Sequence, residues 1–95
     1  MSGDHVLRLY VAGKTARSVR AITDLQRLCA QELNGQYQVE VIDVLEDPAA
    51  AERQKVLATP TVIKELPLPV RRVIGDLSQA EQVLVGLDLV KVDAN

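Results

Sequence analysis

Apolar residues alternate with more polar ones near the start of the chain and then recur at helical spacing. Residues 5–12 alternate, which predicts a strand, and Gly13 predicts the turn that ends it. Apolar positions three or four apart between residues 18 and 33 predict an amphipathic helix, which Asn34 and Gly35 stop with a left-handed turn. The apolar stripe of this helix consists of Val19, Ile22, Leu25, Cys29 and Leu33.

A second strand and a second helix are predicted next. Residues 37–45 are rich in β-branched side chains and follow the first strand at the distance that a parallel βαβ crossover needs. Asp47 can cap the following helix and Pro48 suits its first position. High helix propensity extends from there to residue 57.

Prolines punctuate the second half of the chain. Pro60 precedes an apolar run, where it can begin a strand without removing a central ladder bond. Neither a helix nor a central strand accommodates residues 66–69, which read LPLP. Residues 70–74 predict a short strand, and residues 78–81 match a capping box that would begin a last helix, with the Ser78 hydroxyl as its cap.

The last apolar segment satisfies two periods at once. One face of a helix would hold Ala80, Val83, Leu84, Leu87 and Val90, whereas a strand would align Val85, Leu87 and Leu89. Glycine is unfavourable in both states by about 0.5–1 kcal/mol relative to alanine, so Gly86 favours neither. An ordinary helix and a segment with two alternative packings both remain open.

Composition indicates one small domain over residues 1–95. The chain is 47% hydrophobic but lacks Trp and Phe, so aliphatic side chains must fill a modest core, which self-association would help. The net charge of −2 and the scarcity of aromatic residues argue against nucleic acid as a partner. No apolar run approaches the ~20 residues that cross a bilayer, and no leader pattern begins the chain. We therefore expect a cytoplasmic protein without a membrane partner.

Residues that carry chemistry are few. Cys29 lacks a disulfide partner and is expected to be a buried apolar residue. His5 has no second metal ligand at a suitable spacing and is expected at the surface. The order of elements is thioredoxin-like, but residues 13–18 read GKTARS where a redox protein has C-x-x-C, so we expect neither disulfide exchange nor another enzymatic activity. No cofactor is expected.

Basic residues gather at two places. Lys14, Arg17 and Arg20 surround the loop before the first helix and the first turn of that helix. They are either solvated charges or a positive patch for an acidic partner surface. Arg71 and Arg72 are either guards of an edge strand or partner contacts.

Four stretches of the sequence resemble the KaiB family along nearly the whole chain. They are LRLYVAGKTARSVRAI, YQVEVIDVLEDP, LATPTVIKELPLPVRRVIGDLS and EQVLVGLDLV. The resemblance implies an α/β fold with a thioredoxin-like βαβ N-terminal half and a metamorphic C-terminal half. The chain would form either a resting KaiB-type tetramer or a thioredoxin-like βαβαββα monomer.

The resemblance also implies partners. The monomer would bind the hexameric ATPase ring of a KaiC-like protein, then sequester KaiA and displace a SasA-type histidine kinase in competition. Pro60, Pro67 and Pro69 would be the isomerising residues of a fold switch, on a timescale of tens of seconds, and Gly86 and Asp88 would bias it. Gly86→Ala with Asp88→Arg is expected to favour helix and to speed docking.

The sequence departs from the family pattern at several positions. Leu68 interrupts a run that usually holds three consecutive prolines. Glu40, near Gln38 on the second strand, replaces a usual lysine on the edge that receives KaiA, which puts KaiA capture in doubt.

Three hypotheses follow for the function. A KaiC-binding adaptor is favoured, with a thioredoxin-like sensor domain of the SasA histidine-kinase type as the alternative. That alternative is expected to need a kinase after the domain, whereas this chain ends at Asn95. A redox enzyme is disfavoured because the C-x-x-C motif is missing.

Overall fold

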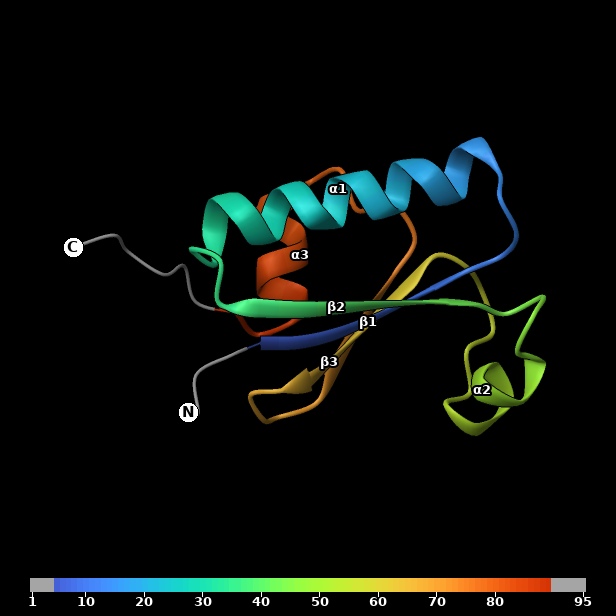
Figure 1. The fold of residues 1–95 in the computed structure, drawn as a ribbon. Helices are drawn as coiled ribbons and strands as arrows, with labels where there is room; N and C mark the ends of the chain where they lie inside the picture. The colour runs from blue at the N-terminus through green and yellow to red at the C-terminus, as the bar shows by residue number, and fades with distance from the viewer. Residues whose placement is uncertain (1–4, 90–95) are drawn as a thin grey trace.

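The computed structural model describes residues 5–89, whose elements follow the order βαβαββα (Figure 1). The elements are β1 His5–Val11, α1 Ala16–Glu32, β2 Tyr37–Asp43, α2 Pro48–Arg53, β3 Thr61–Leu66, β4 Arg71–Ile74 and α3 Ala80–Gly86. The predicted succession of strands and helices is therefore confirmed.

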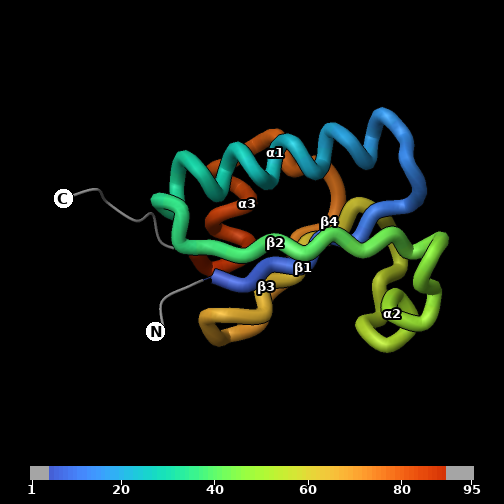
Figure 2. The backbone as a smooth tube through the Cα atoms, in the orientation of Figure 1, coloured from blue at the N-terminus to red at the C-terminus, as the bar shows by residue number. Residues whose placement is uncertain are grey.

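The four strands form one mixed sheet in the order β2-β1-β3-β4. Strand β2 lies parallel to β1, and the crossover between them runs through α1, as the tube in Figure 2 shows. Strand β3 lies antiparallel to both β1 and β4. This is the thioredoxin-like arrangement, one of the two folds that the resemblance implies. Strands β2 and β4 form the two edges of the sheet.

The two faces of the sheet are covered unequally. Helices α1 and α3 lie over one face, and the short helix α2 lies against the other near one end (Figure 1). The main core lies under α1 and α3, where Leu7 and Leu9 of β1 meet Leu25 of α1 and Leu84 of α3. A smaller cluster under α2 contains Tyr10, Ala50 and Ile63.

The period of the apolar residues predicts which side chains are buried in β1, and it does so in α1 with one exception. Leu7 and Leu9 point into the main core, while Tyr10 points to the opposite face of the sheet. In α1 the predicted stripe is buried at Leu25, Cys29 and Leu33. Val19 was predicted to face the core, but it is 58% exposed, because the buried face of the first turns of α1 runs through Ser18 and Ala21 instead.

The ends of α2 show why it is shorter than predicted. The Asp47 carboxylate accepts a hydrogen bond from the Ala50 amide at 3.1 Å, so the predicted cap is confirmed. The helix ends at Arg53 rather than near residue 57. Lys55 takes a left-handed conformation with φ 55°, and the Val56 amide bonds back to the Ala51 carbonyl at 2.9 Å. This Schellman motif returns Val56 to the smaller core cluster, so packing overrides helix propensity.

The start of α3 differs from the prediction. Its N-cap is Gln79, whose side chain makes no capping hydrogen bond, so the predicted capping box is wrong. The Ser78 hydroxyl instead donates to Asp76 at 2.9 Å. A hydrogen bond within this turn replaces the cap.

The last segment is helical in this fold. Val83, Leu84 and Leu87 are buried, whereas Val85 is 80% exposed, as the helical period requires. Val90, which the helical pattern also included, lies outside the described residues.

Two residues were expected to be chemically inert for different reasons. Cys29 is fully buried, as predicted, and burial raises the pKa of its thiol to about 12. His5 was predicted at the surface but is buried, because its Nδ1 lies 2.8 Å from the Gln36 carbonyl oxygen at the start of β2. Among residues 5–89 no helix is long and apolar enough to span a membrane.

Candidate docking site

A cavity of about 440 Å³ lies between the N-terminal half of α1 and the turn that precedes α3. We call it the α1 cleft. Helix α1 contributes Arg17, Arg20 and Asp24 to one wall, and the turn contributes Asp76 and Ser78 to the other. Pro60 also lines the cleft, at the entry to β3.

The start of α1 fixes the position of the arginine wall. Thr15 is the N-cap, and its hydroxyl oxygen accepts a hydrogen bond from the Ser18 amide at 3.1 Å. Ser18 is buried and donates to the Ala12 carbonyl at 3.4 Å. Ser18 faces inward, and its neighbours Arg17 and Arg20 are exposed on the first turns of the helix.

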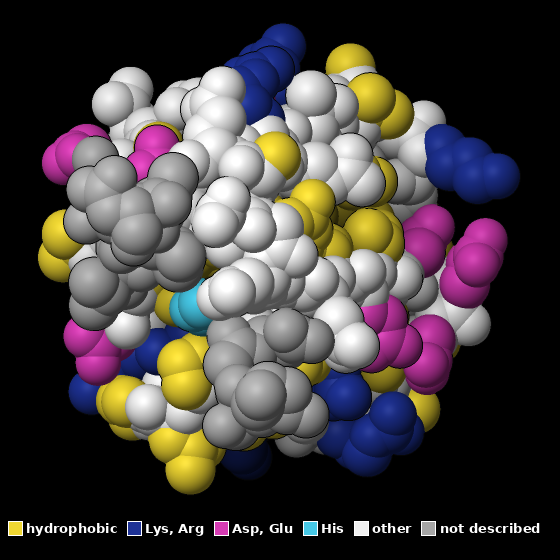
Figure 3. Space-filling model, turned by 60° about the vertical axis from the view of Figure 1, so that its left-hand side comes forward, with side chains coloured by type: hydrophobic (Ala, Val, Ile, Leu, Met, Phe, Trp, Pro, Cys, Tyr) yellow, Lys and Arg dark blue, Asp and Glu magenta, His cyan; other side chains and the backbone are white. Residues whose placement is uncertain are grey.

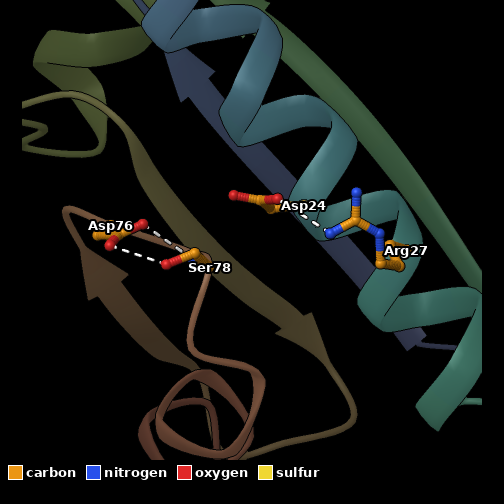
Figure 4. A network of polar contacts seen from close by, with 4 residues as sticks. All are labelled: Asp24, Arg27, Asp76 and Ser78. Carbon is orange, nitrogen blue, oxygen red and sulfur yellow. Dashed lines mark hydrogen bonds and ion pairs between the residues drawn. The ribbon is translucent and has the colours of Figure 1, made fainter.

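The opposite wall is a turn closed by Asp76 and Ser78 (Figure 4). The Ser78 amide donates to Asp76 Oδ1 and the Ser78 hydroxyl donates to Oδ2, both at 2.9 Å. The hydrogen bond from the Ser78 amide contributes most to lowering the pKa of the Asp76 carboxyl. The hydrogen bond from the Ser78 hydroxyl and the nearby Arg20 lower this pKa further. Asp76 is therefore a fixed negative charge on the cleft wall.

Asp24 adds a second carboxylate on the α1 side. Its side chain is only 10% exposed, and one oxygen lies 3.5 Å from Arg27 Nη1 one turn later (Figure 4). Sequence reasoning missed both Asp24 and the Asp76 turn, because only the folded chain brings them to the same cavity.

The predicted basic residues are placed differently from one another. Arg17 and Arg20 line the cleft, whereas Lys14 is exposed but lies outside its lining. Within residues 5–89 none of the three forms an ion pair. They are free to meet an acidic surface.

The face of the molecule in Figure 3 carries mixed charge. Acidic and basic side chains lie next to one another on the face that Figure 3 shows, without a continuous basic area of the kind that nucleic-acid binding uses. Within residues 5–89 no group of three or more His, Cys, Asp or Glu side chains has the geometry of a metal site. The α1 cleft presents guanidinium and carboxylate groups that can form ion pairs with charged groups of opposite sign.

The predicted strand edge forms a separate region. Gln38 and Glu40 are exposed on β2, at the edge of the sheet. Glu40 Oε1 lies 3.0 Å from Arg8 Nε, an ion pair without hydrogen-bond geometry, and Arg8 Nη1 lies 3.7 Å from Glu65 Oε2. Arg8 therefore offsets part of the negative charge at this edge.

The residues predicted to govern a fold switch are spread through the second half. Pro60 is buried, while Pro67 and Pro69 are exposed in the turn between β3 and β4. The peptide bonds preceding all three prolines are cis.

Gly86 and Asp88 lie together at the end of α3. Asp88 has φ 54°, and a Cβ atom on Gly86 would approach Val73 Cγ2 to 2.5 Å. Alanine at position 86 would gain helix propensity but would have to displace Val73 on β4. The expected effect of Gly86→Ala with Asp88→Arg stays a prediction.

One buried residue at this place escaped the sequence reasoning. Lys64 of β3 is fully buried, and its Nζ donates to the Asp88 carbonyl at 3.1 Å. Its position in the alternating run of β3 was the available signal, because period two places it beside Val62 on the core face.

Comparison with known proteins identifies relatives over most of the chain. The model of the KaiB domain matches residues 8–89. Circadian clock oscillator protein KaiB of Synechococcus elongatus is 57% identical over 86 residues, which cover 90% of this chain and 84% of that protein. Circadian clock protein KaiB3 of Synechocystis sp. is 54% identical over 85 residues, covering 90% of this chain and 83% of the relative.

Solved structures with the same fold are more distant in sequence. The N-terminal domain of Synechococcus elongatus SasA has a TM-score of 0.76 at 22% identity, covering 93% of this chain and 87% of that chain. Mitochondrial thioredoxin 3 of Saccharomyces cerevisiae has a TM-score of 0.69 at 18% identity, covering 92% of this chain and 79% of that one. These likenesses establish a thioredoxin-like fold. With a match to the domain model over residues 8–89 and identities of 54% and 57% over about 90% of the chain to clock proteins of that family, the chain belongs to the KaiB family.

Proposed function

We propose that the chain is a cytoplasmic, non-enzymatic clock adaptor that docks onto the ATPase ring of a KaiC-like protein. Docking would modulate the phosphorylation cycle of that protein and its output signalling. The observation that carries the proposal is the placement of Arg17 and Arg20, which form no ion pair within residues 5–89, on the wall of the α1 cleft in a member of the KaiB family.

The electrostatics of the cleft support a protein partner. Arg17 and Arg20 offer positive charge to acidic side chains, and Asp24 and Asp76 offer carboxylates to basic ones. A surface with both signs at fixed positions selects one orientation of its partner. Lys14 adds a further positive charge just outside the cleft.

Substitution of the two arginines tests the proposal. Arg17→Ala with Arg20→Ala should weaken binding to the KaiC-like ATPase of the same organism by about tenfold, and should reduce its salt dependence. Binding is measured by size-exclusion chromatography and by surface-immobilised titration after incubation with ATP. Arg53→Ala, an exposed arginine on α2, is the matched control. Equal affinity of the double variant and the control would refute docking through the cleft.

Fold switching belongs to the same proposal. The segment from Pro60 to Asp88 would exchange between this helical arrangement and the resting KaiB-type form, with Pro67, Pro69 and Gly86 as the other switching positions. If only the helical form docks, apparent affinity falls in proportion to its population, and association is slow.

Further partners are proposed at the opposite edge of the sheet. The β2 edge with Gln38 and Glu40 would receive a KaiA-type partner, although the Glu40–Arg8 pair offers it a different charge from the usual lysine. A histidine kinase would compete for the KaiC-like ring.

A second candidate function is an interaction domain of the SasA type. The likeness to the SasA N-terminal domain favours it, at a TM-score of 0.76. A domain with a single stable fold should reach binding equilibrium with the ATPase ring without a lag. A lag that is independent of ring concentration would favour the switching adaptor instead.

A further inference from the structure

Lys64 is a charged residue without exposed surface on the core-facing side of β3. It lies on β3 opposite Leu7 of β1, on the face of the sheet that α1 and α3 cover. Its exposed fraction is 0%, equal to that of its apolar neighbours Val62 and Ile63. Lysine is almost never fully buried unless its charge is paired.

The described residues around Lys64 provide only part of the hydrogen bonds that its ammonium group can make. An ammonium group has three N–H donors, and among the described residues Lys64 donates to one acceptor, the Asp88 carbonyl. The charged groups that face it are the carboxylate of Asp88, which stabilises the ammonium, and Arg71 of β4, which repels it. On the β1 side it meets the apolar Leu7.

The acceptor of Lys64 lies in the turn that ends α3. The Asp88 amide bonds to the Val85 carbonyl at 3.1 Å, and the Leu89 amide bonds to the Leu84 carbonyl at 2.8 Å. These two bonds close a Schellman motif, and the Asp88 carbonyl that it fixes is the acceptor for Lys64. Lys64 therefore takes its only described acceptor from a residue whose position depends on the end of α3.

We propose that Lys64 disfavours the helical form of the C-terminal segment, because docking of α3 onto the sheet removes water from an ammonium group that has one acceptor, the Asp88 carbonyl, among the described residues. The effective cost of burying an ion in a protein exceeds what one charge-assisted hydrogen bond returns. The cost of burying Lys64 would make α3 open more often. Since the Asp76–Ser78 wall of the α1 cleft leads directly into α3, the cleft would have both walls in place for only part of the time.

The direction of the Lys64 pKa agrees with this geometry. Burial lowers the pKa of Lys64 from its usual 10.5, against the opposing effect of Asp88. The helical form then binds fewer protons at Lys64 than a form in which this side chain is hydrated. Rising pH should therefore favour the helical form over the interval between the lowered pKa and 10.5.

The test compares variants that differ in charge at this position. Lys64→Met keeps the length of the side chain and removes the ammonium, and Lys64→Arg retains a cation. Lys55→Met removes an exposed ammonium at the end of α2 and serves as the control. Amide hydrogen exchange at Leu87 and Leu89, whose N–H groups close the end of α3, reports how often the helix opens.

Lys64→Met is expected to slow exchange at both amides by about tenfold at pH 7, while Lys64→Arg and Lys55→Met leave it equal or faster. Between pH 7 and pH 10, protection corrected for intrinsic exchange should rise in the unmodified protein and stay level in Lys64→Met. Unchanged or faster exchange in Lys64→Met would overturn the proposal, as would the same pH profile in both proteins.

A second readout connects this effect of Lys64 to docking, and it rests on the proposed function. Association with the KaiC-like ATPase should be about tenfold faster for Lys64→Met, because more molecules hold α3 in place. Slower exchange without faster association would support the role of Lys64 and refute docking by the helical form. Unchanged exchange with normal docking would refute the role of Lys64 alone.

Discussion

Cys29 is a fully buried thiol whose ionisation is linked to folding. Burial raises its pKa from 9.0 to about 12, so the unfolded chain loses this proton at lower pH than the folded one. Any stability that depends on the neutral thiol is present below pH 9.0 and is lost as pH rises through about 12. The free energy of unfolding should fall by about 1.4 kcal/mol per pH unit across this interval.

Urea unfolding at a series of pH values measures the effect. Cys29→Ala removes the ionisable group, so the difference between the two proteins isolates the thiol from Tyr10, whose pKa burial also raises. Parallel stability curves for the chain and for Cys29→Ala would contradict the prediction.

Single residues were predictable where period and chemistry agreed. Leu25, Cys29 and Leu33 are apolar, occupy the helical stripe and are buried. Lys64 occupies a core-facing position by period but carries a charge, and its described acceptor, the Asp88 carbonyl, comes from 24 residues further along the chain. His5 is buried for a similar reason, since its acceptor Gln36 lies 31 residues away.

Helices α2 and α3 end in the same motif without the usual glycine. Lys55 and Asp88 occupy the left-handed position with φ 55° and φ 54°, respectively. Glycine adopts this conformation without the steric cost of a Cβ atom, which is about 1–2 kcal/mol. Each helix therefore has a terminus that a single substitution can stabilise.

Asp88→Gly should slow the opening of α3 by about fivefold, measured by hydrogen exchange at the Leu87 amide. Asp88→Asn retains a side chain that tolerates the left-handed conformation and so isolates the loss of the carboxylate near Lys64. Lys55→Gly is the matched control, since it should protect the end of α2 and leave α3 unchanged. Equal protection of α3 by both glycine substitutions would contradict a local effect.

Elements were predictable where one period dominated, and their ends were not. The cap at Asp47 and the stop at Asn34 and Gly35 are local signals, and the structure confirms them. The early end of α2 follows from Val56 packing beneath the sheet, a tertiary contact without a local signature. The choice of helix for residues 80–86 also depends on the core that the first half supplies.

At the scale of the molecule, the α1 cleft unites residues from three separate parts of the chain. The basic residues near α1 were visible in the sequence, but Asp76 and Pro60 join them only through the sheet order. Docking should then depend on how the whole chain is assembled. If a self-associated resting form competes with the docking form, dilution of the protein should speed association with the KaiC-like ring.

Stopped dilution followed by fluorescence anisotropy measures this rate. A tenfold lower protein concentration should increase the rate constant while the final amount of complex per protomer is equal or higher. Rates that are independent of concentration over the range in which light scattering detects tetramers or dimers would contradict a competing assembly.

Because α3 supplies Val83, Leu84 and Leu87 to the same cluster as Leu7 and Val62, its departure would leave a bare aliphatic surface in water. Exposing each such side chain to water costs about 1.5–3 kcal/mol of free energy. A protomer that releases this helix would therefore expose an apolar surface that favours association, and a second protomer could bury that surface. Refolding of the C-terminal segment and self-association would therefore be coupled, because contacts with a second protomer would replace the contacts that α3 makes with the same aliphatic surface.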